Sequence, residues 1–428
     1  MIQKLRDALS SGAESPESLA GDAIARANSN IGKNVYIALD PERVTREAKD
    51  LSSHFPKLHK PPLYGLPISL KDCFDLAGFP TSCGSAAYAA LSGTKKTDSA
   101  VASRLRSQGA VIVGKTNLHP LAYGITGENP DYGDCAQPRD ATRLTGGSSS
   151  GAAASVQEGS AVAAIGTDTG GSIRVPSALC GLAGYRASID LANEQGLWLG
   201  CVPLAQSFDT LGWIFRDLED GPLLMHALFG LPIEQRSSKP VRIARVSDAF
   251  LHDCSPTVIQ VFERWQQRLR EAGAEIVAFD ASGWEQAIEI YAPIQAYEAS
   301  AIHIPRLNRD LSRIPAAIAE RLVWGASLDP GQIKQLRRRH AEFGQRIDAL
   351  LSDFDYAMLP CAPIEGLTLG ADHSQTRPRT LRYTVPMSLA GTPVVTLPDI
   401  SGAGVQLCAS RGQDARLLTF AAQFASGV

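Results

Sequence analysis

The sequence predicts an α/β fold formed by one large domain over residues 1–428. Helical and strand patterns alternate along the chain, which favours a sheet with helices over an all-β fold or a helical bundle. The composition is 44% hydrophobic and 20% charged, so a chain of this length can bury a large core. No Pro- or Ser-rich linker, internal repeat or low-complexity tract interrupts the sequence, and we therefore expect one domain rather than two.

The N-terminal region begins with helical patterns over the first sixty residues. Ser15 is placed to cap one of these helices, and Pro16 then occupies its first position. Apolar side chains at alternate positions over 66–70 predict a strand that ends at Lys71. Two further elements follow: a helix that stops at Gly109 and a buried strand over 110–113.

Residues 145–184 are unusually rich in glycine and poor in cations. They contain nine glycines in forty positions, whereas the whole chain has 38 in 428. From Leu144 to Ile173 there is no Lys or Arg at all. A surface segment rich in loops would normally carry charge, so we expect this segment to be buried.

The remaining sequence alternates again between strands and helices. We expect a strand within 239–250, an amphipathic helix followed by a strand within 255–280, and helices over 284–352. Near the C-terminus, 385–399 and 404–410 contain strand-forming sequence.

Charge and cysteine usage exclude several classes of partner. The formal net charge is −3, which gives no electrostatic reason to expect nucleic acid or an anionic membrane. The N-terminus lacks the apolar stretch of a secretory signal, and no window reaches the run of about 18 apolar residues that spans a bilayer. The eight cysteines form no CxxC pair, and His54 and His59 have no third ligand, so we expect a cytoplasmic protein with buried reduced thiols, no metal site and no cofactor.

Three short motifs match known patterns but lack the surroundings that their chemistry needs. Residues 109–116 have the Walker A spacing, yet the positions that should form a phosphate loop read as a strand. Residues 147–151 match the G-x-S-x-G elbow around Ser149, but a polar and charged segment precedes them instead of an apolar strand. Residues 92–95 match S-x-x-K without its companion motifs. We rank all three below a fourth arrangement.

The fourth arrangement brings together three distant segments. Ser148 and Ser172 are separated by a predicted short helix and a predicted strand. A helix of about ten residues runs about 15 Å away from its start, and a strand of about five residues returns about 16 Å, so the two serines should meet at one edge of the sheet. Lys71 reaches the same edge if its strand is parallel to that strand.

This set of residues can perform nucleophilic catalysis without histidine. A lysine amine becomes a general base if burial lowers its pKa from about 10.4 towards about 7 to 8. Ser148 can then pass a proton between Ser172 and Lys71. The glycines that precede Ser172 let successive backbone N–H groups converge on an oxyanion.

The segments that carry these residues resemble the amidase signature family of serine hydrolases. The resemblance covers residues 15–425 in order and is strongest over 63–215. Its motifs are GLPISLKD, GAVIVGKTNLHPLAYGITGENPDYG, TGGSSSGAAAS, GTDTGGSIRVPSALCGLAGYR, SFDTLG and VPMSLAGTPVVTLPD.

The resemblance implies a mixed central β-sheet flanked by helices and hydrolysis of an amide through an acyl-enzyme, without metal or organic cofactor. It implies that Ser172 is the nucleophile, that Ser148 bridges after a cis peptide bond from Gly147, and that Lys71 is the base and later the acid. The implied oxyanion hole consists of the backbone N–H groups of Thr169, Gly170, Gly171 and Ser172.

Neighbouring residues have less specific expectations. Asp168 and Arg174 bracket the serine loop and are expected to hold it by a salt bridge, with a substrate carboxylate as the alternative partner of Arg174. Tyr123 and Gly124 align with a family segment that often borders the acyl pocket, although an aromatic there can also be core. Ser149 and Ser150 are expected to cap a helix, and Cys180 to serve packing.

Three positions depart from the commoner family pattern: Pro120, Ser150 and Arg186. None of them is one of the three chemical positions.

Two functions of different class follow. The first is a cytoplasmic serine amidase that acts on a small amide, with a homodimer left open. The second is the glutamine-hydrolysing subunit of a tRNA-dependent amidotransferase complex, in which the main task is assembly with a partner. The stretch 235–345 varies most among relatives, so the choice of substrate is expected to depend on it.

Overall fold

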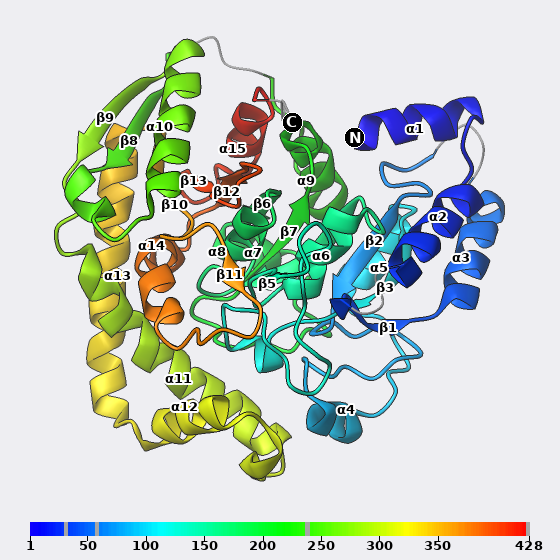
Figure 1. Cartoon of the computed structure of the whole chain (residues 1–428), viewed down its shortest axis with the longest axis horizontal. Coiled ribbons are helices and arrows are strands. Elements are labelled where there is room, and N and C mark those ends of the chain that lie inside the picture. The colour runs from blue at the N-terminus through cyan, green and yellow to red at the C-terminus, as the bar shows by residue number, and fades with distance from the viewer. Residues whose placement is uncertain (30–32, 56–59, 236–239, 425–428) are drawn as a thin grey trace.

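An extended mixed β-sheet runs through the computed structural model, which describes residues 1–428 except 30–32, 56–59, 236–239 and 425–428 (Figure 1). Within the described residues, eleven strands hydrogen-bond side by side. In sheet order they are β1 (Tyr36–Leu39), β3 (Val111–Thr116), β2 (Pro67–Lys71), β5 (Ala163–Asp168), β7 (Thr210–Phe215), β6 (Ala183–Arg186), β12 (Val394–Leu397), β13 (Val405–Cys408), β10 (Tyr356–Pro360), β8 (Arg242–Val246) and β9 (Glu275–Phe279). Two short strands, β4 (Arg143–Leu144) and β11 (Leu367–Thr368), pair separately.

Helices surround the sheet, which confirms the predicted α/β fold with a mixed sheet flanked by helices (Figure 1). Helices α2 and α3 contact β3 near one end of the sheet, and α10 contacts β9 near the other. The helices are α1 (Ile2–Ser11), α2 (Pro16–Ser29), α3 (Pro41–His54), α4 (Ala86–Ser92), α5 (Ala100–Ser107), α6 (Ser150–Glu158), α7 (Arg174–Leu179), α8 (Ile189–Glu194), α9 (Gly221–Phe229), α10 (Pro256–Glu271), α11 (Ala287–Arg306), α12 (Ala316–Ser327), α13 (Pro330–Asp353), α14 (Thr376–Ala390) and α15 (Asp414–Ala421).

The direction of three neighbouring strands creates the site edge. Strand β2 is parallel to both β3 and β5, so its carboxyl end and that of β5 lie at the same edge of the sheet. Strand β2 ends with Lys71, and β5 ends with Asp168, four residues before Ser172. Helix α6 connects the loop of Ser148 to β5, as the spacing of the two serines predicts. The three segments therefore meet as expected.

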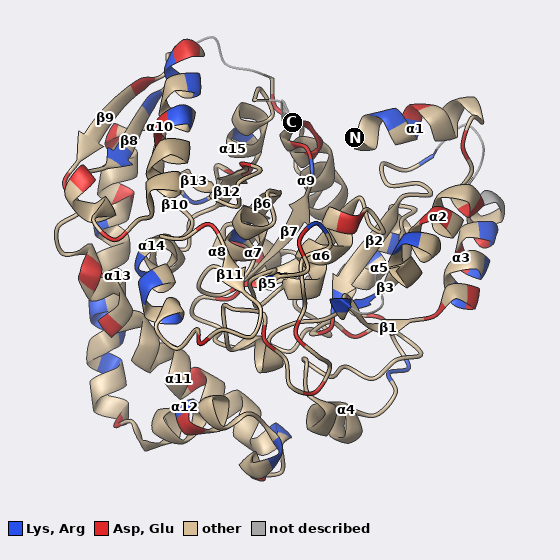
Figure 2. Ribbon diagram, viewed as in Figure 1, with Lys and Arg blue, Asp and Glu red and all other residues tan. Residues whose placement is uncertain are grey.

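The glycine-rich segment is buried, which confirms that expectation. Helix α6 is enclosed over nearly its whole length, and every residue of β5 is buried. Charged side chains are spread instead over outer helices such as α3, α10 and α13 (Figure 2). None of the helices described here combines the length and apolar composition that a membrane crossing requires.

Two elements differ from the sequence-based expectations. Strand β1 lies within the first sixty residues, where we predicted helices; it has four half-buried residues and pairs antiparallel with β3. Residues 385–390 belong to α14 rather than to a strand. That part of α14 is buried on every side, and a fully buried helix has no polar face to distinguish its sequence from that of a buried strand. Strands β12 and β13 follow as predicted.

Candidate active site

Lys71 is fully buried at the end of β2 and has neutral hydrogen-bond partners. Its Nζ donates to Ser148 Oγ at 2.8 Å, to Thr167 Oγ1 at 2.9 Å and to the Thr167 carbonyl at 3.4 Å. Burial lowers the pKa of Lys71 from its ordinary value, while Cys73 and Cys201, and then Asp168 and Asp209, oppose the shift. The site therefore favours the neutral amine more than water does.

The loop of Ser148 is fixed on both sides of its first peptide bond. The Gly147–Ser148 bond is cis, as the family resemblance implies. The Gly147 amide donates to the Ile125 carbonyl at 2.8 Å, and the Ser148 carbonyl accepts from the His119 amide at 3.0 Å. A Cβ at Gly147 would meet backbone atoms of Gly127, so the close approach of the two loops requires glycine there. These contacts hold the Ser148 hydroxyl against Lys71.

The loop of Ser172 adjoins that of Ser148. The Ser149 amide donates to the Ser172 carbonyl at 3.3 Å, which ties the two serine loops together. Ser172 follows Gly171, whose φ of 120° is unfavourable for residues with a side chain. The structure thus brings Lys71, Ser148 and Ser172 to one place, although they are distant in sequence.

Asp168 anchors the serine loop through a buried ion-pair network. Its carboxylate accepts from Nη2 of Arg174 at 2.8 Å and from Nη1 of Arg186 at 3.0 Å. It also accepts the amides of Gly171 at 2.8 Å and Ile173 at 3.1 Å. Burial alone would raise the pKa of Asp168, but the two guanidinium groups hold it well below its usual range. The loop of Ser172 is therefore held by a carboxylate that stays ionised.

The geometry corrects two of the residue assignments. The amide of Gly171 already donates to Asp168, so it is not free to serve as an oxyanion donor. The described hydrogen bonds leave the amides of Gly170 and Ser172 uncommitted.

Arg174 is fully buried, and its side-chain donors are taken by Asp168 together with Thr384, Ser388 and Gln406. Arg174 has no donor left for a substrate carboxylate, and its role is structural.

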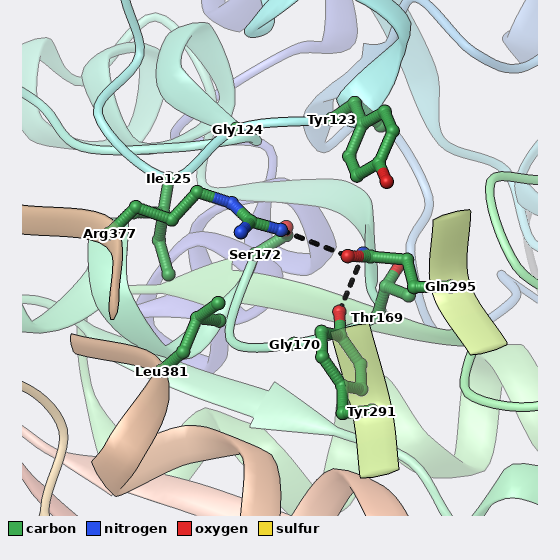
Figure 3. Close-up of a pocket in the computed structure, with 11 residues that line it drawn as sticks. Tyr123, Gly124, Ile125, Thr169, Gly170, Ser172, Tyr291, Gln295, Arg377 and Leu381 are labelled. Carbon is green, nitrogen blue, oxygen red and sulfur yellow. Dashed lines mark hydrogen bonds between the residues drawn. The ribbon is translucent and has the colours of Figure 1, made fainter. Parts of the chain in front are cut away.

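A narrow cavity of about 20 Å³ lies beside Ser172 (Figure 3). Tyr123 and Gly124 line it, together with Thr169 and Gly170. A Cβ at Gly124 would overlap the ring of His119, so the absence of a side chain allows the loop to close. The cavity is completed by residues that the sequence reasoning missed: Tyr291 and Gln295 of α11, and Arg377 and Leu381 of α14. No local motif marked these positions.

Ser149 and the two lysines of the competing motifs bond other parts of the chain. Ser149 occupies the predicted N-cap position of α6, but its hydroxyl makes no capping bond and instead donates to the Thr167 carbonyl at 3.4 Å. Lys115, the lysine of the Walker-like spacing, is buried within β3 and forms an ion pair with Asp72. Lys95 of the S-x-x-K match pairs with Asp75 at 3.5 Å.

The cysteines are free thiols, and the histidines form no metal-binding group with them in the described residues. All eight cysteines are free, and Cys180 is buried, which raises the pKa of its thiol. No group of three or more His, Cys, Asp or Glu side chains gathers within the described part of the chain in a way that would hold a metal ion. His59 of the histidine pair lies outside the described residues.

Comparisons with known proteins agree on one family. The family model described as Amidase matches residues 20–418. The chain is 28% identical to a glutamyl-tRNA(Gln) amidotransferase subunit from Gloeobacter violaceus, over 97% of this chain and 94% of that protein. It is 30% identical to a 2-amino-5-chloromuconic acid deaminase from Comamonas testosteroni, over 84% and 81%. A crystal structure of an amidase superposes with a TM-score of 0.89 at 29% identity, with 98% of both chains covered.

Proposed function

Because the chain belongs to the amidase signature family, we propose that it is a serine amidase that hydrolyses a small amide. The products would be a carboxylic acid and ammonia or an amine, and the reaction would pass through an acyl-enzyme. One observation carries the proposal: the buried amine of Lys71 lies 2.8 Å from Ser148 Oγ. The loop that holds Ser148 is in turn hydrogen-bonded to the loop that holds Ser172.

The proposed first step moves one proton along this row of groups. Ser172 Oγ attacks the amide carbon as its proton passes to Ser148 Oγ, while the Ser148 proton passes to the neutral Lys71 Nζ. The resulting ammonium returns a proton through Ser148 to the leaving nitrogen, and the C–N bond breaks. Water then attacks the acyl ester by the same relay and restores Ser172.

The proposed oxyanion donors are the amides of Gly170 and Ser172, with Thr169 beside them. Each preorganised donor in sites of this kind contributes about 3 to 4 kcal/mol to transition-state stabilisation. Gly171 takes a different part: its amide bonds Asp168 and thereby sets the curvature of the loop. Tyr123 and Gly124 form one wall of the acyl pocket.

Active-site labelling tests the nucleophile. A fluorophosphonate probe should modify the wild-type chain at Ser172 and should leave Ser172→Ala unlabelled. Ser92→Ala is the matched control, because Ser92 lies at the end of α4 in the competing S-x-x-K match. Equal labelling of the Ser172→Ala variant, or labelling lost in Ser92→Ala, would remove the basis of the proposal.

The second candidate is the glutamine-hydrolysing subunit of a tRNA-dependent amidotransferase complex. Similarity to the Gloeobacter violaceus relative over nearly the whole of both chains favours it. The two functions differ in what the isolated chain does. A stand-alone amidase releases ammonia from small amides without a partner, whereas the subunit hydrolyses glutamine and copurifies with a second protein. A cytoplasmic location suits either function, because the eight cysteines are free thiols.

A further inference from the structure

Two arginines approach the ring of Tyr123 from helices α12 and α14. The Cζ atom of Arg321 in α12 lies 4.4 Å from the ring centroid, and that of Arg377 in α14 lies 5.8 Å from it. Arg377 lines the same cavity as Ser172, and its guanidinium points into that cavity toward Ser172 (Figure 3). Two cations therefore stand at the proposed acyl pocket.

These arginines bond neutral groups rather than carboxylates. Arg377 Nη2 donates to Gln295 Oε1 at 2.9 Å, and Arg321 Nε donates to the Ala317 carbonyl at 2.9 Å. Nη1 of Arg321 is buried and has no hydrogen-bond partner. In the part of the chain that the structure describes, no carboxylate forms an ion pair with either side chain. This contrasts with Arg174, whose charge is matched by Asp168.

The unmatched charge affects the neighbouring groups. Burial, and then the positive charge of Arg377, lower the pKa of Arg321 to about 10. Burial, followed by the charges of Arg321 and Arg377, lowers the pKa of His119 to about 3. Both guanidinium groups are half-buried and have no carboxylate partner among the described residues, so an anion that entered between them would gain charge-assisted hydrogen bonds.

An outer hollow of about 660 Å³ gives access to this position. It shares Gly124, Ile125 and Arg377 with the cavity beside Ser172, and Arg321 also lines it. Two acidic residues lie in the outer hollow as well, but their carboxylates bond their own loops. Glu128 accepts from Thr126 Oγ1 at 2.6 Å, and Asp372 accepts from the Ser374 amide at 2.9 Å.

A short chain of hydrogen bonds fixes Arg377 relative to the serine loop. Gln295 Nε2 donates to Tyr291 Oη at 2.6 Å, while Gln295 Oε1 accepts from Arg377 (Figure 3). Tyr291 packs against Gly170, where any Cβ would meet its hydroxyl group. The guanidinium is thus positioned by the same side chains that support the loop of the proposed nucleophile.

Resting on the proposed amidase function, we propose that the substrate is a small amide that carries a carboxylate. Arg377 and Arg321 bind that carboxylate while the amide carbon lies at Ser172. Ser172 and Arg377 line the same cavity, so a short spacer suffices to join the amide carbon to the carboxylate. The substrate class is therefore that of monoamides of short dicarboxylic acids or short N-acyl amino acids.

Matched substrates test the carboxylate site. Succinamate and butanamide differ in a terminal carboxylate or methyl group, and the wild-type chain should show kcat/KM at least tenfold higher for succinamate. In Arg377→Gln this ratio should fall roughly 10- to 100-fold, mostly through KM, since charged hydrogen bonds of this kind contribute that much. Arg379→Gln is the control: Arg379 lies on the same helix, contacts Asp253 and should keep the wild-type ratio.

A second substrate pair identifies which side of the amide carries the charge. N-acetylglycine and N-ethylacetamide differ in the same way on the amine side. Preference for succinamate places the carboxylate on the acyl part, and preference for N-acetylglycine places it on the leaving group. Equal kcat/KM within both pairs, or an unchanged ratio in Arg377→Gln, would overturn the proposal.

A binding measurement separates this proposal from the proposed amidase function. Succinate should bind the wild-type chain in isothermal titration calorimetry, and Arg377→Gln should bind it at least tenfold more weakly. If fluorophosphonate labelling and turnover fail while succinate binding depends on Arg377, the amidase function is wrong and the carboxylate site stands. If labelling and hydrolysis of neutral amides succeed but succinate does not bind, only the carboxylate site is wrong.

Discussion

Lys71 Nζ lies 2.8 Å from Ser148 Oγ, and none of its hydrogen-bond partners is a carboxylate. This separates Lys71 from Lys115, the other fully buried lysine of the neighbouring strand, which is paired with Asp72. A buried lysine that has only hydroxyl and carbonyl partners loses its proton more readily than one in water. The two lysines are equally buried and differ in their partners, which is why Lys71 rather than Lys115 is the proposed base.

The first prediction concerns the pH dependence of turnover. Because burial lowers the pKa of Lys71, and the neutral amine is the proposed active form, kcat/KM should rise as pH increases through that lowered pKa and then level off. Lys71→Arg should be inactive at every pH, since its guanidinium keeps its proton. A profile that shows no rise anywhere in the pH range in which the protein stays folded, or substantial turnover by Lys71→Arg, would place the base elsewhere.

The second prediction distinguishes the two serines. Ser172→Ala should lose both labelling and turnover, because no nucleophile remains. Ser148→Ala should lower turnover by about 10²- to 10⁴-fold through loss of the proton relay, yet it should still be labelled slowly at Ser172. Rates from steady-state kinetics and from mass spectrometry of the labelled peptide check both. If Ser148→Ala turned over normally, the relay would be refuted.

The sequence predicted which three candidate catalytic residues lie together, but it did not predict most of the residues that line the pocket. Lys71, Ser148 and Ser172 could be placed together because short elements of known length bring their ends to one edge of a parallel sheet. The partners of Asp168 were found only in part: Arg174 was expected, whereas Arg186 looked like a family departure until the fold placed it on the same carboxylate.

The pocket residues were missed because their positions depend on tertiary packing. Gln295 and Arg377 are separated by long helices in sequence, and neither stands in a recognisable motif. The strand expected over 385–390 failed for a related reason, because packing buries that end of α14 on all sides. The spacing of apolar residues indicates which face of an element is buried, and it gives no such indication where every face is buried.

The third prediction concerns stability. Asp168→Asn would leave Arg174 and Arg186 buried without their counterion, and breaking a buried ion pair in this way costs about 3 to 5 kcal/mol. The free energy of unfolding, measured by urea titration, should fall by that amount. Asp22→Asn is the matched control: Asp22 is exposed, and its substitution should change stability by less than about 0.5 kcal/mol.

Acid unfolding provides a second test of the same network. The folded-state pKa of Asp168 lies below its unfolded value, so its ion pairs contribute fully above the unfolded pKa of about 3.9 and are lost as pH falls below it. The wild-type chain should therefore lose stability relative to Asp168→Asn below about pH 4. A constant difference between the two down to pH 2 would contradict the predicted ionisation.

The fourth prediction concerns Gly170. A Cβ there would meet the hydroxyl group of Tyr291, so Gly170→Ala must displace either the loop or the tyrosine. Displacing the loop moves a proposed oxyanion donor, and loss of one such donor lowers kcat by about 10²- to 10³-fold. Steady-state kinetics of Gly170→Ala, with kcat and KM compared separately, measure this loss.

A second substitution shows whether Gly170 acts through the oxyanion loop. Tyr291→Phe removes the oxygen that the new Cβ would meet, so the double variant should recover part of the lost kcat. Tyr291→Phe also releases Gln295, the partner of Arg377, and should by itself raise KM for a carboxylate substrate more than it lowers kcat. The recovery should be incomplete, because the Cβ would also lie 2.9 Å from Tyr291 Cζ. If Gly170→Ala left kcat unchanged, the loop geometry would not be what limits the reaction.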